Sequence, residues 1–195
     1  MDVLITVPHA KCLLWHPKKW HSCDYDAQLF AEMLFSKLSK IHRAQLFIGD
    51  LNRLETVDLN RLESRLTTFR EKIRSKLFKL ITNNISTEIY LFDVHSYPLD
   101  SENFKTIKVP NPDVVIIYNH LKNKDKAEIF KSSFIKSGFK VNLFLSHGND
   151  IIDESTTIEK EYKLDIRIIP LLIEILEGMS QEKKKKLIKV ISNLL

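Results

Sequence analysis

The chain has 195 residues, of which 44% are hydrophobic and 28% are charged, and its formal net charge is +5. These values are typical of a globular protein, and they predict a single domain over residues 1–195. They exclude a transmembrane protein, because no apolar run approaches the ~18 residues that a membrane-spanning helix needs. The start MDVLITVPHAK lacks the features of a signal peptide, and two cysteines are too few for a disulfide scaffold. We therefore expect a cytoplasmic protein with free thiols and no membrane partner.

The predicted elements alternate along the chain. Apolar runs predict strands at 4–7, 45–48, 89–92, 113–118, 140–145 and 168–176, the last despite Pro170. Amphipathic stretches predict helices from Asp24, as N-cap, to about Lys40, over 66–81, over 125–137 with Gly138 at its C′ position, and from Ser180 onward. This alternation predicts an α/β fold with a mainly parallel sheet and helices on both faces.

The densest basic run, Lys183–Lys186, lies in the last predicted helix. The apolar residues Leu187, Ile191 and Leu194 follow it at helical spacing. We interpret the lysines as the solvated face of that helix rather than as a patch for nucleic acid. A nucleic-acid partner is therefore not expected.

The stretch EIYLFDVHSYP, residues 88–98, predicts the central strand of the sheet. Its unbroken apolar part suits a strand that is covered on both faces, and ligands of open α/β sheets bind at the carboxyl ends of such strands. Strand alternation places Asp93 and His95 on the same face, so that one could bind a metal while the other orients it. The alternative is an ordinary strand end with a capping Asp and a half-buried His.

An imperfect repeat follows the second predicted strand. Asp50-Leu51-Asn52-Arg53 recurs eight residues later as Asp58-Leu59-Asn60-Arg61. An acid, an amide and a guanidinium within four residues are costly to assemble unless they pair with one another or bind a ligand. This segment is therefore a candidate binding site.

A carboxylate also interrupts the last apolar run, in which Glu174 follows Leu171-Leu172-Ile173. A buried carboxylate should face a metal, an arginine or a substrate, and a salt bridge to Arg167 or to a lysine is the structural alternative. Two histidines with one carboxylate and an open position form a common ligand set for catalytic zinc.

The motifs resemble, in their order, those of N-formylglutamate amidohydrolases. They are VPHA at 7–10, an Asp that opens the first helix, VDLNR at 57–61, DVHSYP at 93–98, PDVVI at 112–116, the turn at 138–141 and LLIEI at 171–175. That family looks like a distant relative of the zinc carboxypeptidases and aspartoacylases. The resemblance implies a three-layer phosphorylase/hydrolase-like α/β fold with a mixed, mainly parallel central sheet. It also implies zinc-dependent hydrolysis of a C–N amide bond in a small carboxylate-bearing substrate, such as an N-acyl amino acid or a peptide.

Carried over residue by residue, the resemblance implies one zinc ion per chain. Its ligands would be His9, His95 and Asp24, with Asp26 as the alternative carboxylate. Glu174 would be the general base, which takes a proton from the attacking water and passes it to the leaving nitrogen.

The resemblance also implies roles around this centre. Asn60 and Arg61 would hold the substrate carboxylate, because the planar guanidinium matches a carboxylate with two hydrogen bonds. Arg53 and Arg65 would reinforce them, while Asp93 and Asp58 would support the groups that bind metal and substrate.

Two other functions stay open at this point. In a nuclease, Asp50, Asp58, Asp93 and His95 would hold Mg²⁺ or Mn²⁺, and the net positive charge would favour a phosphodiester substrate. The other is a binding protein that keeps the fold and has lost the reaction.

Overall fold

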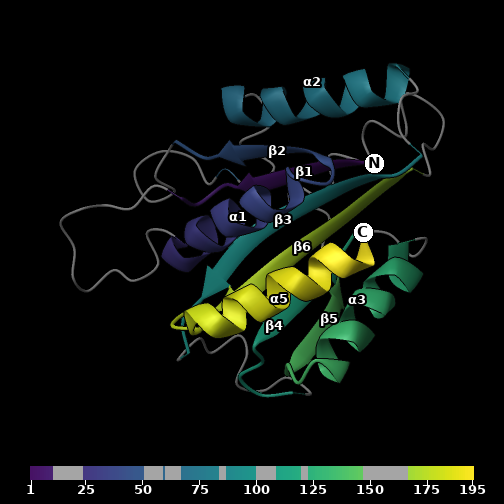
Figure 1. Ribbon diagram of the computed structural model, residues 1–195. Helices are drawn as coiled ribbons and strands as arrows, with labels where there is room; N and C mark the ends of the chain where they lie inside the picture. Colours follow the sequence, from purple (N-terminus) through teal and green to yellow (C-terminus); the bar gives the residue numbers. More distant parts are fainter. Residues whose placement is uncertain are drawn as a thin grey trace.

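The protein is built around one six-stranded sheet with the order β2-β1-β3-β6-β4-β5 (Figure 1). The computed structural model describes residues 1–10, 24–50, 59, 67–83, 87–99, 109–119, 123–146 and 167–195. The strands are β1 (Asp2–Val7), β2 (Arg43–Ile48), β3 (Ile89–Tyr97), β4 (Val114–Tyr118), β5 (Val141–Leu145) and β6 (Ile168–Leu176). Strand β4 runs antiparallel to β6 and parallel to β5, and the other neighbours are parallel. The sheet is therefore mixed and mainly parallel.

Helices cover both faces of this sheet. One face packs against α1 (Tyr25–Leu38), α3 (Lys124–Lys136) and α5 (Gln181–Leu194) in the larger hydrophobic core. The other packs against α2 (Thr68–Thr82), which lies apart from the other helices in Figure 1. The three-layer α/β fold expected from the sequence is confirmed. No helix within the described segments is long and apolar enough to span a membrane.

Strand β3 lies in the middle of the sheet, between β1 and β6, and all nine of its residues are buried. Tyr90, Phe92 and Val94 point to the larger core, whereas Ile89 and Leu91 pack under α2. Because side chains alternate along a strand, Asp93 and His95 follow Ile89 and Leu91 on the α2 face. The apolar part of β3 thus anchors the strand, and its polar end lies beyond the α2 contact.

The observed elements agree with the predicted ones to within a few residues. Strand β3 extends past its apolar run through Tyr97, so Asp93 and His95 lie within the strand, as the predicted alternation of their side chains requires. The strand at Pro170 is confirmed: β4 pairs with Leu171–Ile175 of β6 and stops short of the proline. The proline therefore lies outside the stretch where β6 needs partners on both sides.

One prediction about α5 is wrong. The lysine run at its start was expected to be solvated, but Lys184 is only 2% exposed. Its ammonium donates to Asp26 at 2.5 Å, and Asp26 also accepts from the backbone N–H of Gly178 at 2.6 Å. A buried cation needs such a partner, so this lysine ties α5 to the first turn of α1. Lys185 and Lys186 are exposed, as expected.

Candidate metal centre

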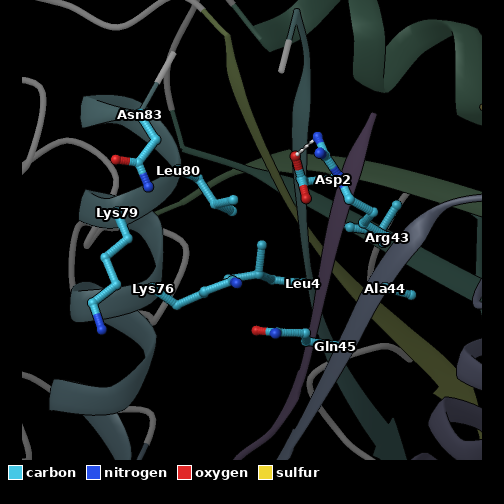
Figure 2. Close-up of a pocket in the computed structure, with 10 residues that line it drawn as sticks. Asp2, Leu4, Arg43, Ala44, Gln45, Lys76, Lys79, Leu80 and Asn83 are labelled. Carbon is cyan, nitrogen blue, oxygen red and sulfur yellow. Dashed lines mark hydrogen bonds and ion pairs between the residues drawn. The ribbon is translucent and has the colours of Figure 1, made fainter. Parts of the chain in front are cut away.

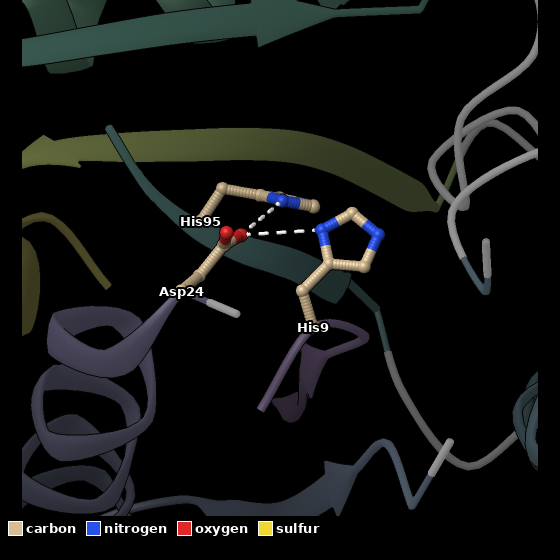
Figure 3. A group of neighbouring side chains, drawn as sticks. All are labelled: His9, Asp24 and His95. Carbon is tan, nitrogen blue, oxygen red and sulfur yellow. Dashed lines mark hydrogen bonds and ion pairs between the residues drawn. The ribbon is translucent and has the colours of Figure 1, made fainter. Parts of the chain in front are cut away.

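Two histidines and one carboxylate meet at the C-terminal end of the parallel strands (Figure 3). His9 follows β1, Asp24 immediately precedes α1, and His95 lies near the end of β3. One ligand atom from each lies within 4.8 Å of the others, and all three residues are buried. Within the described segments, this is the one cluster of histidine, cysteine and acidic residues arranged to hold a metal ion.

Asp24 occupies the N-cap position of α1, but its side chain does not cap the helix. Its Oδ2 atom instead lies 3.3 Å from Nδ1 of His9 and 2.9 Å from Nδ1 of His95. The backbone N–H of Asp24 donates to the carbonyl of His9 at 2.8 Å, which holds the start of α1 against the turn after β1. The carboxylate is thereby directed at both imidazoles rather than at its own helix.

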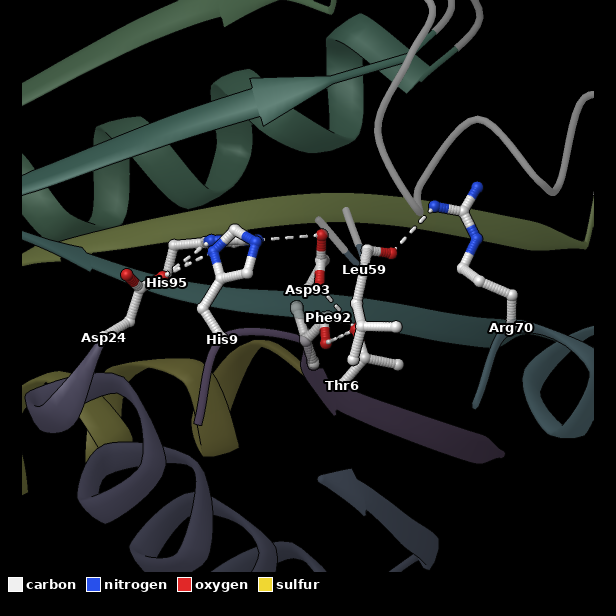
Figure 4. Close-up of polar contacts among 8 residues, drawn as sticks. All are labelled: Thr6, His9, Asp24, Leu59, Arg70, Phe92, Asp93 and His95. Atoms are coloured by element: carbon white, nitrogen blue, oxygen red, sulfur yellow. Dashed lines mark hydrogen bonds and ion pairs between the residues drawn. The ribbon is translucent and has the colours of Figure 1, made fainter. Parts of the chain in front are cut away.

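His95 is oriented from behind by a second carboxylate (Figure 4). Its Nε2 atom lies 3.1 Å from Oδ2 of Asp93, and the hydroxyl of Thr6 donates to Oδ1 of Asp93 at 2.6 Å. Thr6 and Asp93 are both fully buried. When His95 is neutral and donates from Nε2 to Asp93, its Nδ1 carries the lone pair that faces Asp24 and His9. This is the tautomer that a metal ion requires.

The electrostatics of the metal-free cluster favour charge separation. Burial alone would raise the pKa of Asp24, but the hydrogen bonds with His9 and His95 outweigh it and hold that pKa well below its ordinary value. Burial alone would lower the pKa of His95, but the negative charge of Asp93 and the hydrogen bonds to Asp24 and Asp93 raise that pKa well above its ordinary value. Without a metal, the cluster therefore favours the protonated form of His95 between its two carboxylates.

The turn that carries His9 is placed by a close backbone contact. The N–H of Gly49, directly after β2, donates to the carbonyl of Val7 at 2.8 Å. A Cβ atom on Gly49 would lie 2.1 Å from the carbonyl oxygen of Pro8 and 2.9 Å from Cδ1 of Leu59. Only glycine allows the chain to pass so close to the residue before His9.

The structure separates the two candidate carboxylates. Asp24 lies at the histidine pair, whereas Asp26 lies with Lys184 and Gly178, on the contact between α1 and α5 described above. Asp26 is already balanced by a buried cation. The geometry therefore favours Asp24 as the third member of the cluster.

Glu174 lies next to the cluster in the sheet register. Residue pairs of β3 and β6 match His95 with Glu174, and paired residues of neighbouring strands project to the same face. Glu174 is half-buried. The pKa of Tyr97 is raised first by burial and then by the negative charge of Glu174, so this carboxylate also lies near the end of β3. Arg167, which the structural alternative named as a salt-bridge partner of Glu174, donates to the carbonyl of Ile81 at 3.0 Å.

The predicted substrate-binding residues Arg53, Asn60, Arg61 and Arg65, and the supporting Asp58, lie outside the described residues. Leu59, in the middle of the second DLNR, is described and fully buried in the core under α2. Its carbonyl accepts a hydrogen bond from Nη1 of Arg70 at 3.2 Å (Figure 4). Leu59 itself therefore lies on the α2 face of the sheet.

Sequence reasoning missed two residues, Thr6 and Arg70. Arg70 is only 2% exposed, although it lies on the first turn of an amphipathic helix. In the sequence, Thr6 is only a polar residue inside an apolar strand, and this pattern alone does not predict that it binds Asp93. Asp50, which the nuclease hypothesis needs, is exposed directly after β2.

Comparison with known proteins supports the fold. No protein-family profile matches the sequence, and no curated protein matches it. Solved structures do match over the whole chain. An N-formylglutamate amidohydrolase from Ralstonia eutropha has a TM-score of 0.62 at 12% identity, covering 98% of this chain and 90% of that one. A gene product of Agrobacterium tumefaciens has a TM-score of 0.64 at 12% identity, covering 98% and 86%.

A third similar structure is an N-acetylmuramoyl-L-alanine amidase of Nostoc punctiforme, with a TM-score of 0.53 at 13% identity. That match covers 100% of this chain and 94% of the amidase. At these identities the likeness establishes a shared fold. The chain thus has the fold of an N-formylglutamate amidohydrolase, and two buried histidines face one carboxylate at the carboxyl edge of its sheet.

Proposed function

We propose that this protein is a zinc-dependent hydrolase that cleaves an amide C–N bond in a carboxylate-bearing substrate, such as an N-acyl amino acid or a peptide. The observation that carries the proposal is the buried cluster of His9, Asp24 and His95. The names of the similar structures, an amidohydrolase and an amidase, support the same reaction class.

The chemistry of the cluster fits zinc better than magnesium. Two imidazole nitrogens and one carboxylate oxygen form a typical catalytic zinc set, whereas Mg²⁺ prefers oxygen ligands. His95 is backed by Asp93, the carboxylate–histidine arrangement that commonly supports a zinc ligand. His9, Asp24 and His95 would hold the ion, which when bound supplies a Lewis acid that polarises the substrate carbonyl and eases ionisation of water.

The remaining steps belong to side chains of this chain. Glu174, in register with His95, would accept a proton from the attacking water and deliver it to the leaving nitrogen. Asn60 and Arg61 would bind the substrate carboxylate, with Arg53 and Arg65 beside them.

Asp58 would support that group of substrate-binding residues, close to Leu59, whose carbonyl accepts from Arg70. Asp93 would keep the Nδ1 atom of His95 directed at Asp24, with Thr6 fixing Asp93 in turn. These roles assign binding, proton transfer and orientation to separate groups.

The proposal is tested with Glu174→Gln beside the wild type. Both proteins are loaded with zinc and assayed against N-formylglutamate, other N-acyl amino acids and dipeptides. We expect the variant to keep its zinc and to lose the turnover that the wild type shows on at least one of them. Unchanged turnover would remove Glu174 from the role of base, and Mg²⁺-dependent cleavage of DNA by the wild type would favour the nuclease.

A further inference from the structure

A groove runs between α2 and the edge strand β2, and none of the three residues of the metal centre lines it. Two cavities of about 430 and 400 Å³ make it up, and they meet at Gln45, Lys76 and Lys79. Figure 2 shows the end toward the start of β1, where Lys76 extends from α2 toward the strands. Each cavity has the volume of a small-molecule binding site, and the two together form one elongated groove.

The wall formed by α2 is basic. Lys72, Lys76 and Lys79 follow one another at i, i+4 and i+7, so they form one stripe along the helix. All three line the cavities, and within the part of the chain that the structure describes none of them lies in an ion pair. The neighbouring positive charges repel one another, and this repulsion destabilises the helix slightly unless an anion binds in the groove.

Acidic residues in the groove are few. Asp2 lies at its far end, where Arg43 donates to it at 2.8 Å, and Glu71 lines the other cavity. The groove thus keeps a net positive charge, and charge complementarity selects a ligand with several negative groups.

The groove leads toward the candidate active site. Phe47, which lines the nearer cavity, pairs with Thr6 of β1, and Thr6 pairs with Asp93 of β3. These three residues lie side by side on the α2 face, and strands are spaced ~4.8 Å apart, so Phe47 lies roughly 10 Å from Asp93. From Thr68 to Asn83 the groove follows α2 for roughly 22 Å, the length of an extended peptide of six or seven residues.

We propose that this groove binds an acidic, extended segment of a peptide substrate, while another part of the same peptide reaches the metal centre. Strand β2 is at the edge of the described sheet, and an extended peptide can pair its main chain with such a strand while its carboxylates meet the lysine stripe. The inference rests on the proposed amide hydrolysis and narrows its substrate class from small N-acyl amino acids to acidic peptides.

The test measures binding of a fluorescein-labelled hexaglutamate peptide by fluorescence polarisation. The groove variant replaces Lys72, Lys76 and Lys79 with Gln, which removes the charges and keeps good helix-forming residues. The matched control replaces Lys185, Lys186 and Lys189, exposed lysines of α5, with Gln, so that the net charge changes equally. Circular dichroism melting checks that both variants fold.

We expect the groove variant to bind at least about tenfold more weakly than the wild type, and the control variant to bind within about twofold of it. Binding should weaken as NaCl rises from about 50 to about 500 mM. If the groove variant does not fold, the single charge reversals Lys72→Glu and Lys79→Glu, both at exposed positions, provide the comparison.

Equal loss of binding in both triple variants would overturn the proposal, because net charge alone would then explain the affinity. Tighter binding of a single-stranded DNA oligonucleotide at the same lysines would also overturn it, in favour of a nucleic-acid groove. His95→Ala separates this proposal from the hydrolase: it should lose turnover and retain hexaglutamate binding. The protein could also hydrolyse none of the amides and still bind the peptide through the groove. That result would refute the proposed hydrolysis and support peptide binding in the groove.

Discussion

Replacing Thr6 with Val tests whether the carboxylate behind His95 is held in place by a hydroxyl. The change keeps the shape of a fully buried side chain and removes the donor that lies 2.6 Å from Asp93. A hydrogen bond to a charged group contributes about 1.5–3 kcal/mol, and the valine methyl leaves one carboxylate oxygen without that donor. For a chain of this length, that loss lowers the melting temperature by about 3–12 °C.

The same substitution should weaken zinc binding. Without the hydroxyl, Asp93 has more freedom, and the Nδ1 atom of His95 is directed less firmly at Asp24. Removing a partner of this kind typically lowers metal affinity 10–100-fold, and because Thr6 acts through Asp93 we expect about tenfold. Competition with a chromogenic chelator measures the affinity directly.

Thr6→Ser is the control, because it restores the hydroxyl and should bind zinc almost as tightly as the wild type. Wild-type affinity in Thr6→Val would refute the reasoning that Thr6 and Asp93 orient His95. An equal loss of affinity in Thr6→Ser would show that the shape of the side chain at position 6, and not the hydroxyl alone, keeps His95 in place.

Three further predictions follow from the site. Gly49→Ala places a methyl against the carbonyl of Pro8 and should cost about 1–3 kcal/mol in the free energy of unfolding, measured by urea titration; an unchanged midpoint would contradict this. Asp24→Asn should lose zinc, whereas Asp26→Asn should lose about 3 kcal/mol of stability and keep zinc, and the reverse pattern would exchange their roles. In the metal-free protein the pKa of His95 is raised above its ordinary value of 6.5. The protonated imidazole therefore stabilises the fold fully at a pH below 6.5, and this stabilisation is lost as the pH rises through the raised pKa. Zinc must displace that proton, so its affinity should rise with pH, and calorimetry at neutral pH in buffers of different ionisation enthalpy should show proton release; zinc binding without proton release would contradict a protonated His95.

The layers of this fold were predictable because each strand carries its own signal. The apolar run at 89–92 predicted a strand buried on both faces, and β3 lies at the centre of the sheet. The strand continues through His95 because the polar residues find partners on neighbouring elements, Thr6 and Asp24, which are distant in sequence. Hydrophobic periodicity carries no information about such partners. The resemblance implied a mixed sheet, but the hydrophobic pattern could not show that β4 is the strand that runs antiparallel to β6.

The candidate site was predicted in part. The structure brings together His9, Asp24 and His95, the three residues that the resemblance implied as metal ligands, because each lies at the carboxyl edge of the sheet. The resemblance implied Asp24 with Asp26 as the alternative, and the residues alone could not separate the two, because both lie in or beside the first helical turn. It depends on Lys184, a residue 158 positions away from Asp26 that looked solvated in the sequence. A charged residue within a helical charge run gives no sign that it is buried.

Zinc content of the purified protein tests the central claim most directly. Wild type, His95→Ala and His42→Ala are compared by elemental analysis after zinc supplementation and removal of loosely bound metal. His42 is a half-buried histidine outside the cluster, so it controls for the loss of an imidazole. We predict about one zinc per chain in the wild type and in His42→Ala, and a loss of zinc in His95→Ala. A wild type without zinc, or zinc retained by His95→Ala, would contradict the metal centre and the hydrolase built on it.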